Sequence, residues 1–495
     1  MYRRQFLSSA GLFLASASAG CSLIRGDGAS PPQSKRNILM ICVDDLNGWI
    51  RPLGGYHQNI HTPALDRLAS QGVVFTKAYC SVPACNPSRT ALLTGLAPTV
   101  SGCYLNQDKW LDIVPDAVTL PRLFKQSGYW TAGFGKIFHN ESNDDSSAWH
   151  VRTYRQISPY PTNPPLSGIH ELWETRGRFD WGPIDVSVEE MDDHHQVNHA
   201  IDALQTDRDP PFFIACGIFR PHLPWYVPRK FIDLYPLDEI NLPIVLETDL
   251  EDIPTMGRRH ALTSEHELIL EAGQWKNAVQ AYIASISFAD YEIGRLLDAL
   301  ETSGKSNNTM IVLWSDHGWH LGPKNHWRKF SLWEEATRSV LMFSGPDFQK
   351  GRTCERTVSL LDVFPTLSDY LGIQLPTAAI KGNSLLPLLN SPDLSWPYPA
   401  ISTFIRGNHS IRSEEYRYTR YSDGGEELYD HRVDPNEWTN LAGQDKARDI
   451  IDELSKWLPT QEAPTDSTYP HLETAWLEAP SGRRFLNPNV EEFLG

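Results

Sequence analysis

Four side chains have the types and the places that a divalent-cation site requires: Asp44, Asp45, Asp316 and His317. The first two follow an apolar run at residues 37–43, and the other two come just after a second run at residues 309–314. Carboxylate oxygens are the preferred ligands of hard cations, and three carboxylates favour calcium, with magnesium as the alternative. Each acid alone is more often a solvated loop residue or a helix cap. Their joint placement at the ends of two apolar runs predicts a metal site.

A cysteine begins a dense pattern, Cys85-Asn86-Pro87-Ser88-Arg89, that continues to Gly95. With average residue usage, C-x-P-S-R is expected by chance in roughly one chain in a thousand of this length. A structural cysteine ahead of a proline turn and a helix is the ordinary alternative. The spacing puts Arg89 one helical turn after Cys85, so we expect the guanidinium to hold the group at position 85.

Two lysines and two histidines complete the candidate catalytic set: Lys136, His139, His222 and Lys329. The lysines can neutralise the oxygens of an anionic group. The histidines are candidates for the general acid and the general base, and the sequence does not say which takes which role. A solvated side chain is the default for each lysine alone. The settings G-K-x-x-H and R-P-H favour function.

The elements that must position these residues alternate between strand and helix. Apolar runs at residues 37–43, 129–134, 211–219 and 309–314 predict buried parallel strands. Thr62 and Pro63 predict an N-cap and first helical turn, and apolar spacing predicts a long helix at 278–302. The fold class is α/β, with a large, doubly wound, mostly parallel sheet. Ligands bind beyond the carboxyl ends of such strands, where every candidate lies.

The texture of the sequence divides the chain into three parts. Residues 1–35 predict a leader and linker, 36–396 the catalytic domain, and 397–495 a smaller α+β domain with an antiparallel sheet. The net charge of −17 and the pI near 5.4 argue against a nucleic-acid or anionic-membrane binder. The seven cysteines show no zinc-type spacing, and we expect Cys42 and Cys216 to be buried thiols.

The first residues predict export. Arg3-Arg4-Gln5-Phe6-Leu7 resembles a twin-arginine signal, and the apolar run after it is too short to span a bilayer. Ser18-Ala19-Gly20-Cys21 resembles a lipobox, which predicts lipidation of Cys21 and a place in the periplasm or on an outer or cell membrane. Cleavage after a small residue and secretion is the alternative. A lipid anchor is then the one expected membrane contact.

Together these motifs resemble the type I, formylglycine-dependent sulfatases of the alkaline phosphatase superfamily. Lys136-x-x-His139, His317 and Trp327-x-Lys329 are more similar to the iduronate-2-sulfatase branch, and Glu427-Leu428-Tyr429-Asp430 and Asp434-Pro435 extend the match. The segment Pro323-Lys324-Asn325-His326 departs from that branch, so the sugar is left open. The resemblance implies a sulfuric ester hydrolase acting on a sulfated polysaccharide or its oligosaccharides.

The resemblance also implies a mechanism. A formylglycine-generating enzyme would oxidise Cys85, which also faces the metal, to an aldehyde whose hydrate carries two hydroxyls. One hydroxyl attacks sulfur, and the other later expels sulfate. Side chains that could line the substrate pocket are Trp225, Trp319, His320, His326 and Arg328. An ordinary surface-loop role is equally open for Trp225, His320, His326 and Arg328.

Two rival functions stay open at the level of sequence. A phosphonate or phosphate monoester hydrolase of the same superfamily can use the same scaffold. A non-catalytic glycan-binding lipoprotein would keep Cys85 as a thiol, although an intact set of acids and cations argues against this.

Overall fold

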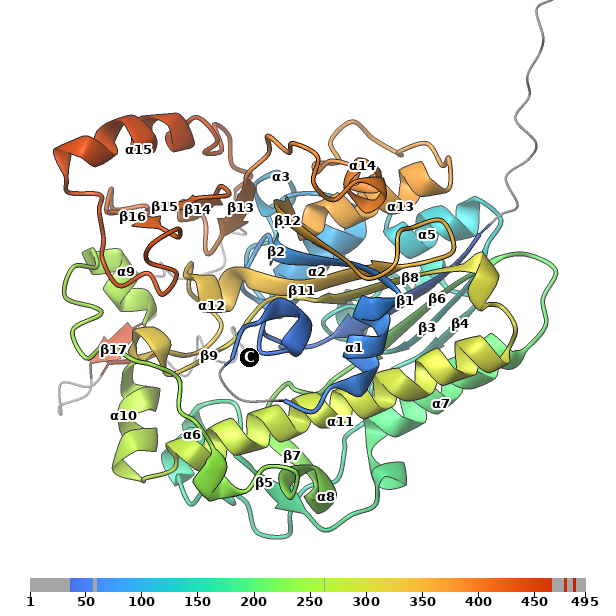
Figure 1. Cartoon of the computed structure of the whole chain (residues 1–495), viewed down its shortest axis with the longest axis horizontal. Helices are drawn as coiled ribbons and strands as arrows, with labels where there is room; N and C mark the ends of the chain where they lie inside the picture. The colour runs from blue at the N-terminus through green and yellow to red at the C-terminus, as the bar shows by residue number, and fades with distance from the viewer. Residues whose placement is uncertain (1–35, 57–59, 262, 465–475, 479–483, 487–495) are drawn as a thin grey trace, which may run out of the picture. The chain divides into compact units, whose positions relative to one another are not determined.

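The computed structural model describes residues 36–56, 60–261 and 263–464, with the backbone of 476–478 and 484–486. An eight-stranded sheet runs through it in the order β12-β2-β11-β8-β1-β6-β3-β4 (Figure 1). Only β11 is antiparallel to its neighbours in this sheet. The strands are β1 (Asn37–Val43), β2 (Gly72–Tyr79), β3 (Trp130–Gly135), β4 (Val151–Thr153), β6 (Phe212–Ile218), β8 (Thr309–Ser315), β11 (Arg338–Ser344) and β12 (Arg352–Ser359).

Both faces of this sheet are covered by helices, as a doubly wound fold requires. Alternate residues of β1 enter two different apolar cores, with Ile41 on one side and Met40 on the other. The core around Ile41 contains α1 (Pro63–Ser70), α7 (Asp192–Gln205) and α11 (Trp275–Thr302). The core around Met40 contains α2 (Cys85–Thr94), α5 (Leu120–Gln126) and α13 (Val363–Tyr370) (Figure 1). The predicted fold class is confirmed.

The start of α1 differs from the sequence prediction in one respect. The Thr62 side chain makes no capping hydrogen bond, and its buried hydroxyl has no hydrogen-bond partner among the described residues. The Asp290 carboxylate of α11 instead accepts from the backbone N–H groups of Ala64, at 3.0 Å, and Leu65, at 2.7 Å. The Asp290 carboxylate from another helix therefore replaces a local N-cap side chain, an interaction that typically stabilises a helix by about 1 kcal/mol.

The C-terminal part contains the expected small antiparallel sheet. Its strands are β13 (Ala400–Thr403), β14 (His409–Arg412), β15 (Tyr416–Arg420) and β16 (Glu426–Asp430), in that order. Helix α15 (Arg448–Ser455) covers it, with Ile451 and Leu454 in a core with Leu428. The Ser402 hydroxyl donates to the Cys80 carbonyl of the large sheet at 2.6 Å. Both sheets belong to one compact unit, and the exact domain boundaries stay predictions.

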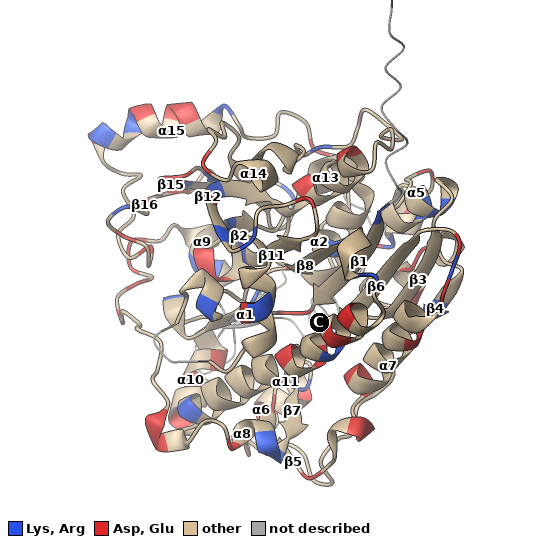
Figure 2. Cartoon of the chain, turned by 45° about the vertical axis from the view of Figure 1, so that its right-hand side comes forward, with Lys and Arg blue, Asp and Glu red and all other residues tan. Residues whose placement is uncertain are grey.

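Several predictions about the surface and the termini can be compared with the structure. The leader, including Cys21, lies outside the described residues. Within the described part, no helix has the length and apolar character needed to cross a membrane. The six described cysteines are all buried free thiols, as expected for Cys42 and Cys216. Acidic residues are spread along α7, α11 and α15 (Figure 2), consistent with the net charge of −17.

Candidate active site

Cys85 is the first residue of α2 and is fully buried at the carboxyl-terminal edge of the large sheet. Its Sγ atom lies 2.9 Å from Lys329 Nζ, 3.4 Å from His317 Nε2 and 3.8 Å from Asp45 Oδ1. Burial alone would raise the pKa of the thiol, but the positive charges of Lys136 and Lys329 together lower it by more. The pKa of Cys85 is therefore below its ordinary value. Position 85 therefore lies where a nucleophile would be stabilised as an anion.

The start of α2 is fixed by its second residue. The Asn86 backbone N–H donates to Asn106 Oδ1 at 2.9 Å, and the Asn86 side-chain amide donates to the carbonyls of Leu105, at 3.1 Å, and Asp108, at 2.8 Å. Sequence analysis did not select Asn86. An asparagine directly after the reactive cysteine is the one signal that could have found it.

Arg89 connects the acids of two strands. Its guanidinium donates to Asp44 Oδ1 at 2.8 Å and to Asp316 Oδ2 at 2.9 Å. Its remaining nitrogen donates to the carbonyls of Lys136 and Ile137. The structure therefore assigns Arg89 to orienting the two acids. The predicted contact between Arg89 and a modified residue at position 85 stays a prediction.

The pKa values of the neighbouring acids Asp44 and Asp45 are shifted in opposite directions. Burial raises the pKa of Asp44, but Lys136 and Arg89 pull it well below its usual range. At Asp45 the effect of burial is larger than the attraction of Lys329, so the pKa of this carboxyl is raised to about 8. Asp45 Oδ2 is buried and has no hydrogen-bond partner among the described residues. Lys329 contacts Oδ1 and leaves Oδ2 uncompensated, and a bound cation would supply the missing charge.

The donor set fits a hard divalent cation. Asp45, Cys85, Asp316 and His317 have ligand atoms within 4.8 Å of one another, and so do Asp44, Asp45, Cys85 and His222. The Asp45 N–H donates to Asp316 Oδ1 at 3.1 Å, which ties the ends of β1 and β8 together. Asp45 and Cys85 belong to both groups, whereas Asp44 belongs to one and Asp316 and His317 to the other, and the geometry does not identify the ion.

Two of the three histidines turn Nε2 toward Asp45, and the third has an Nδ1 with no hydrogen bond among the described residues. His317 Nδ1–H donates to Gly318 O at 2.9 Å, so its Nε2 faces Cys85 and lies 3.3 Å from Asp45 Oδ1. His222 Nδ1–H donates to Leu223 O at 2.7 Å, and its Nε2 lies 3.8 Å from Asp45 Oδ2. His139 Nδ1 is buried with no hydrogen-bond partner among the described residues. Each ring thus has one nitrogen available for the site.

Lys136 and Lys329 approach the acids from opposite parts of the chain. Lys136 follows β3, and its Nζ contacts Asp44 Oδ2. Lys329 follows β10 (Trp327–Arg328), which pairs with β9 (His320–Leu321) in a short hairpin. Its Nζ lies 3.0 Å from Asp45 Oδ1 and 5.3 Å from the centroid of the Trp319 ring.

The hairpin that carries Lys329 has an unusual backbone. Four of its non-glycine residues have left-handed φ angles: Lys324 at 60°, Asn325 at 47°, Arg328 at 71° and Phe330 at 73°. Such conformations persist only where the surroundings enforce them. The Phe330 N–H donates to Pro83 O at 3.1 Å, and His326 Nε2–H donates to Lys329 O at 2.7 Å.

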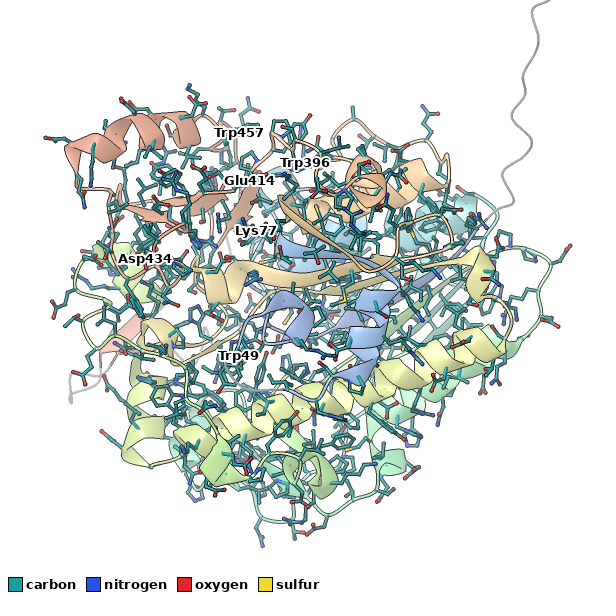
Figure 3. The ribbon with its side chains drawn as sticks, in the orientation of Figure 1. Trp49, Lys77, Trp396, Glu414, Asp434 and Trp457 are labelled. Atoms are coloured by element: carbon teal, nitrogen blue, oxygen red, sulfur yellow. The ribbon has the colours of Figure 1, made fainter. Side chains whose placement is uncertain are left out.

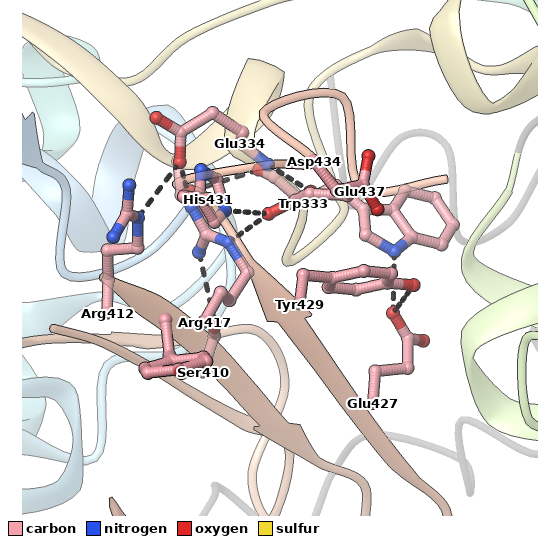
Figure 4. Close-up of polar contacts among 12 residues, drawn as sticks. Trp333, Glu334, Ser410, Arg412, Arg417, Glu427, Tyr429, His431, Asp434 and Glu437 are labelled. Carbon is pink, nitrogen blue, oxygen red and sulfur yellow. Dashed lines mark hydrogen bonds and ion pairs between the residues drawn. The ribbon is translucent and has the colours of Figure 1, made fainter. Parts of the chain in front are cut away.

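The C-terminal part holds the segment that follows Lys329 through three side chains. These are Arg417 of β15, Glu427 of β16 and Glu437 in the loop after β16, and we call them the small-sheet clasp (Figure 4). Arg417 Nη1 donates to Leu332 O at 3.2 Å. Glu427 Oε2 accepts from the Trp333 indole N–H at 2.9 Å, and Glu437 Oε2 accepts from the Glu334 N–H at 2.9 Å. The C-terminal part therefore helps to set the position of Lys329.

Glu334, His431 and Glu437 also have the spacing of a metal cluster, but their charges are already balanced. Arg417 pairs with Glu334 and Glu437, and Arg412 pairs with Glu334 (Figure 4). Two guanidinium groups opposite two carboxylates leave this cluster as an ion-pair network between the two sheets.

The five residues predicted to line the substrate pocket are all buried. Trp225 is fully buried in the core, and Trp319 lies against Lys329. The other three support the hairpin: His320 contacts Ser331 Oγ, His326 bonds Lys329 O, and Arg328 pairs with Glu265. Their contact with a substrate stays a prediction.

Tyr282 of α11 is a residue that sequence analysis missed. Its hydroxyl donates to Asp45 O at 2.8 Å and accepts from the Asn47 N–H at 3.0 Å. It thereby braces the left-handed Asp45, whose φ is 59°. A tyrosine on the otherwise apolar face of the predicted helix was the available signal.

The larger cavities lie away from this chemistry. Trp396 and Trp457 border one of about 430 Å³, and Trp49, Lys77 and Glu414 border one of about 620 Å³ (Figure 3). Neither has a predicted catalytic residue among its described lining residues. A smaller cavity of about 130 Å³ does include Lys136 and His139.

The Sulfatase family model matches residues 36–373, which contain every acid, lysine and histidine of this site. The chain belongs to the sulfatase family. This sulfatase is accordingly a sulfuric ester hydrolase. A second model, N-sulphoglucosamine sulphohydrolase, C-terminal, matches residues 322–463, which include the Lys329 hairpin and the small-sheet clasp.

Two relatives support this membership. A sulfatase of Formosa agariphila is 39% identical over 451 residues, covering 88% of each chain. The iduronate 2-sulfatase of Homo sapiens is 30% identical over 386 residues, covering 69% of this sulfatase and 70% of the relative.

Solved structures share the fold. One, in complex with its substrate D-glucosamine-2-N,6-O-disulfate, has a TM-score of 0.67 at 21% identity, covering 85% of this sulfatase and 96% of that chain. The phosphonate monoester hydrolase of Silicibacter pomeroyi has a TM-score of 0.69 at 19% identity, covering 92% and 99%. These identities show a common fold alone, so the phosphonate hydrolase is only a distant neighbour.

Proposed function

We propose that this sulfatase removes sulfate from a carbohydrate, with a formylglycine made from Cys85 as nucleophile and a calcium ion at the acids. The observation that carries the proposal is the position of Cys85 Sγ, between Lys329, His317 and Asp45. Magnesium is the alternative ion, because the same oxygen ligands suit both.

The chain's own residues have separable tasks. Asp44, Asp45, Asp316 and His317 would hold the cation, and Arg89 orients Asp44 and Asp316. Hydrated formylglycine would supply one hydroxyl as nucleophile and a second whose deprotonation releases the product. Lys136 and Lys329 bind the sulfate oxygens, where their charge counts most because the site is buried. His222 Nε2 or His139 exchanges a proton with the leaving oxygen.

A carbohydrate substrate is supported by what the similar proteins are named for. The human relative is an iduronate 2-sulfatase, and one structural neighbour was solved with a disulfated glucosamine. Those substrates belong to those proteins, and we carry over only the class, a sulfated sugar within a polysaccharide or its oligosaccharides. A cationic pair, Lys136 and Lys329, in a chain of net charge −17 agrees with local recruitment of an anion.

Export and maturation complete the proposal. The Arg3-Arg4 motif and Cys21 support export and lipid attachment, to the periplasm or an outer or cell membrane. Labelled fatty acid incorporated into the wild type, and absent from Cys21→Ala, would support the anchor. A formylglycine-generating enzyme is the required maturation partner, and a free thiol at Cys85 in the mature protein would contradict this.

The decisive experiment measures free sulfate released by aldehyde-containing protein from a panel of sulfated polysaccharides and oligosaccharides. Cys85→Ala should keep its fold, by circular dichroism, and lose all turnover, because no nucleophile is left. Chelation should also abolish release, and added calcium should restore it. Faster turnover of matched aryl phosphonates than of aryl sulfates, or retained activity in Cys85→Ala, would contradict the proposal.

A further inference from the structure

A small basic cavity of about 130 Å³ adjoins the reactive centre. Its lining includes Lys136 and His139 and also Arg152 of β4, with Tyr154 and Arg155, which follow that strand. Because Lys136 and His139 belong to the catalytic set, a group in this cavity is next to a sulfate held by Lys136. The cavity has room for a carboxylate or sulfate group.

The two arginines of this cavity differ in how they are held. Arg152 donates through Nε to the buried Asp144 and through Nη1 to Gly135 O at 3.0 Å. Its guanidinium carbon lies 4.4 Å from the centroid of the Tyr154 ring. Since Asp144 balances its charge, Arg152 serves as a wall of the cavity.

Arg155 is exposed and carries its charge without an ion-pair partner in the described part of the chain. Among the described residues, its one hydrogen bond is a long one of 3.4 Å, donated to Gln156 O. Asp192 is close enough for Arg155 to influence its pKa, but that carboxylate already accepts from the Gln156 N–H and Gln196 Nε2. Most donors of the Arg155 guanidinium are therefore available to a ligand.

Phe219 places Arg155 relative to the catalytic residues. The guanidinium carbon of Arg155 lies 4.0 Å from the centroid of the Phe219 ring, and Lys136 Nζ lies 5.2 Å from the same centroid. The ring of His222 is 4.6 Å from it. One buried aromatic ring thus fixes a free cation beside two residues of the catalytic set, as cation–π contacts can.

We propose that Arg155 binds a second anionic group of the substrate, a carboxylate or a second sulfate, on the sugar that carries the scissile sulfate or on its neighbour. This rests on the proposed action on sulfated carbohydrates. Glu141 is the one acid among the described lining residues, and it is exposed, so water screens its charge. The site therefore selects dianionic over singly charged sugars.

The test uses Arg155→Gln in the mature, calcium-loaded full chain, with Arg258→Gln, another exposed arginine, as the matched control. Inhibition of aryl sulfate turnover is measured with two disaccharide pairs. One pair is a monosulfated uronic disaccharide and its carboxyl-reduced form, and the other is a disulfated disaccharide and its monosulfated form. Inhibition constants are defined even for a sugar that is not cleaved, so this test is separate from that of the proposed function.

We expect the dianionic member of at least one pair to inhibit the wild type better, and Arg155→Gln to raise its inhibition constant about tenfold, the loss of about 1.4 kcal/mol. The singly charged member should change less than twofold, and Arg258→Gln should change neither. Equal inhibition by both members of each pair in the wild type would overturn the proposal. So would an equal effect of Arg155→Gln on both members.

Discussion

The proposed active site consists of two halves that are built differently. The sheet half contains Asp44, Asp45, Lys136, His222 and Asp316, each at or just beyond a strand end, with Arg89 joining them from α2. The hairpin half is Lys329, carried by residues 320–330. There the strands have two residues each, and four non-glycine residues adopt left-handed φ angles.

We infer that the two halves contribute differently to stability and to turnover. The sheet half is inseparable from the core, because its acids pair with a fully buried arginine. The hairpin half depends on contacts from the small-sheet clasp, which lies about a hundred residues further along the chain. We therefore expect changes in the two halves to have different signatures in folding and in turnover.

The largest effect is expected from Arg89→Met. Two buried carboxylates would lose their partner, and breaking such a pair costs about 3–5 kcal/mol. Sulfate release should fall at least about a thousandfold because the acids lose their orientation. Urea unfolding and sulfate release measure the two effects, with the surface arginine change Arg67→Met as control, at about 1 kcal/mol or less. A free energy of unfolding within about 1 kcal/mol of the wild-type value would contradict the proposed difference between the two halves.

Lys329→Met should lower turnover about 100-fold to 1,000-fold with a smaller loss of stability. The reason is that burial raises the pKa of Asp45 to about 8 even against the attraction of Lys329, so this carboxyl can stay neutral once Lys329 is removed. Asp44 keeps Lys136, the larger cause of its low pKa, when Arg89 is removed, and so stays charged. Unfolding should be followed with chelator present, to remove any cation. A stability loss as large as that of Arg89→Met would show that the hairpin is no separate half.

A smaller effect is expected from Glu437→Gln, which weakens the small-sheet clasp. We expect turnover to fall about tenfold because Lys329 loses its fixed position. Glu426→Gln, which changes a less buried acid on β16 of the small sheet, should change turnover less than twofold. In the Lys329→Met background, Glu437→Gln should have little further effect on turnover. Additive losses would mean that the clasp acts through some other part of the site.

The smallest effect concerns acid. Burial raises the pKa of Glu437, but Arg417 and His431 lower it to about 2, below the ordinary 4.5. A depressed carboxyl pKa gives stability that is present above the ordinary value and is lost as pH falls toward the folded value. Between about pH 5 and pH 3, the melting temperature should therefore fall less steeply in Glu437→Gln than in the wild type. Parallel curves would contradict this.

The same comparison explains what sequence could predict. Apolar runs place strand ends, and parallel strand ends share one edge, so Asp44, Asp316 and Lys136 could be brought together without a structure. The hairpin gave no such signal, because Lys324 and Phe330 have no residue-level preference for left-handed φ. Asp290 capping α1 was hidden for another reason: its partners are more than two hundred residues away.

Lys329 was found by its motif, but what holds it was not. Arg417 and Glu437 lie in segments whose alternating pattern predicts strands and turns, and nothing in that pattern says which loop of the large domain they face. Long-range side-chain pairing is decided by packing of the two sheets. Local sequence therefore selected the candidate site residues but not the side chains that support them.

Because Cys85 is buried in the folded protein, a maturation enzyme can reach it only before the residues that cover it are synthesised and folded. No surface of this side chain is open once Lys329 and the acids have closed over it. Lys329 is made 244 residues after Cys85, which at synthesis rates of about 5–20 residues per second is roughly 12–50 seconds. The oxidation proposed for Cys85 must therefore precede folding, so the maturation enzyme has to act on a nascent or still unfolded chain. A chain that folds before this oxidation would stay inactive.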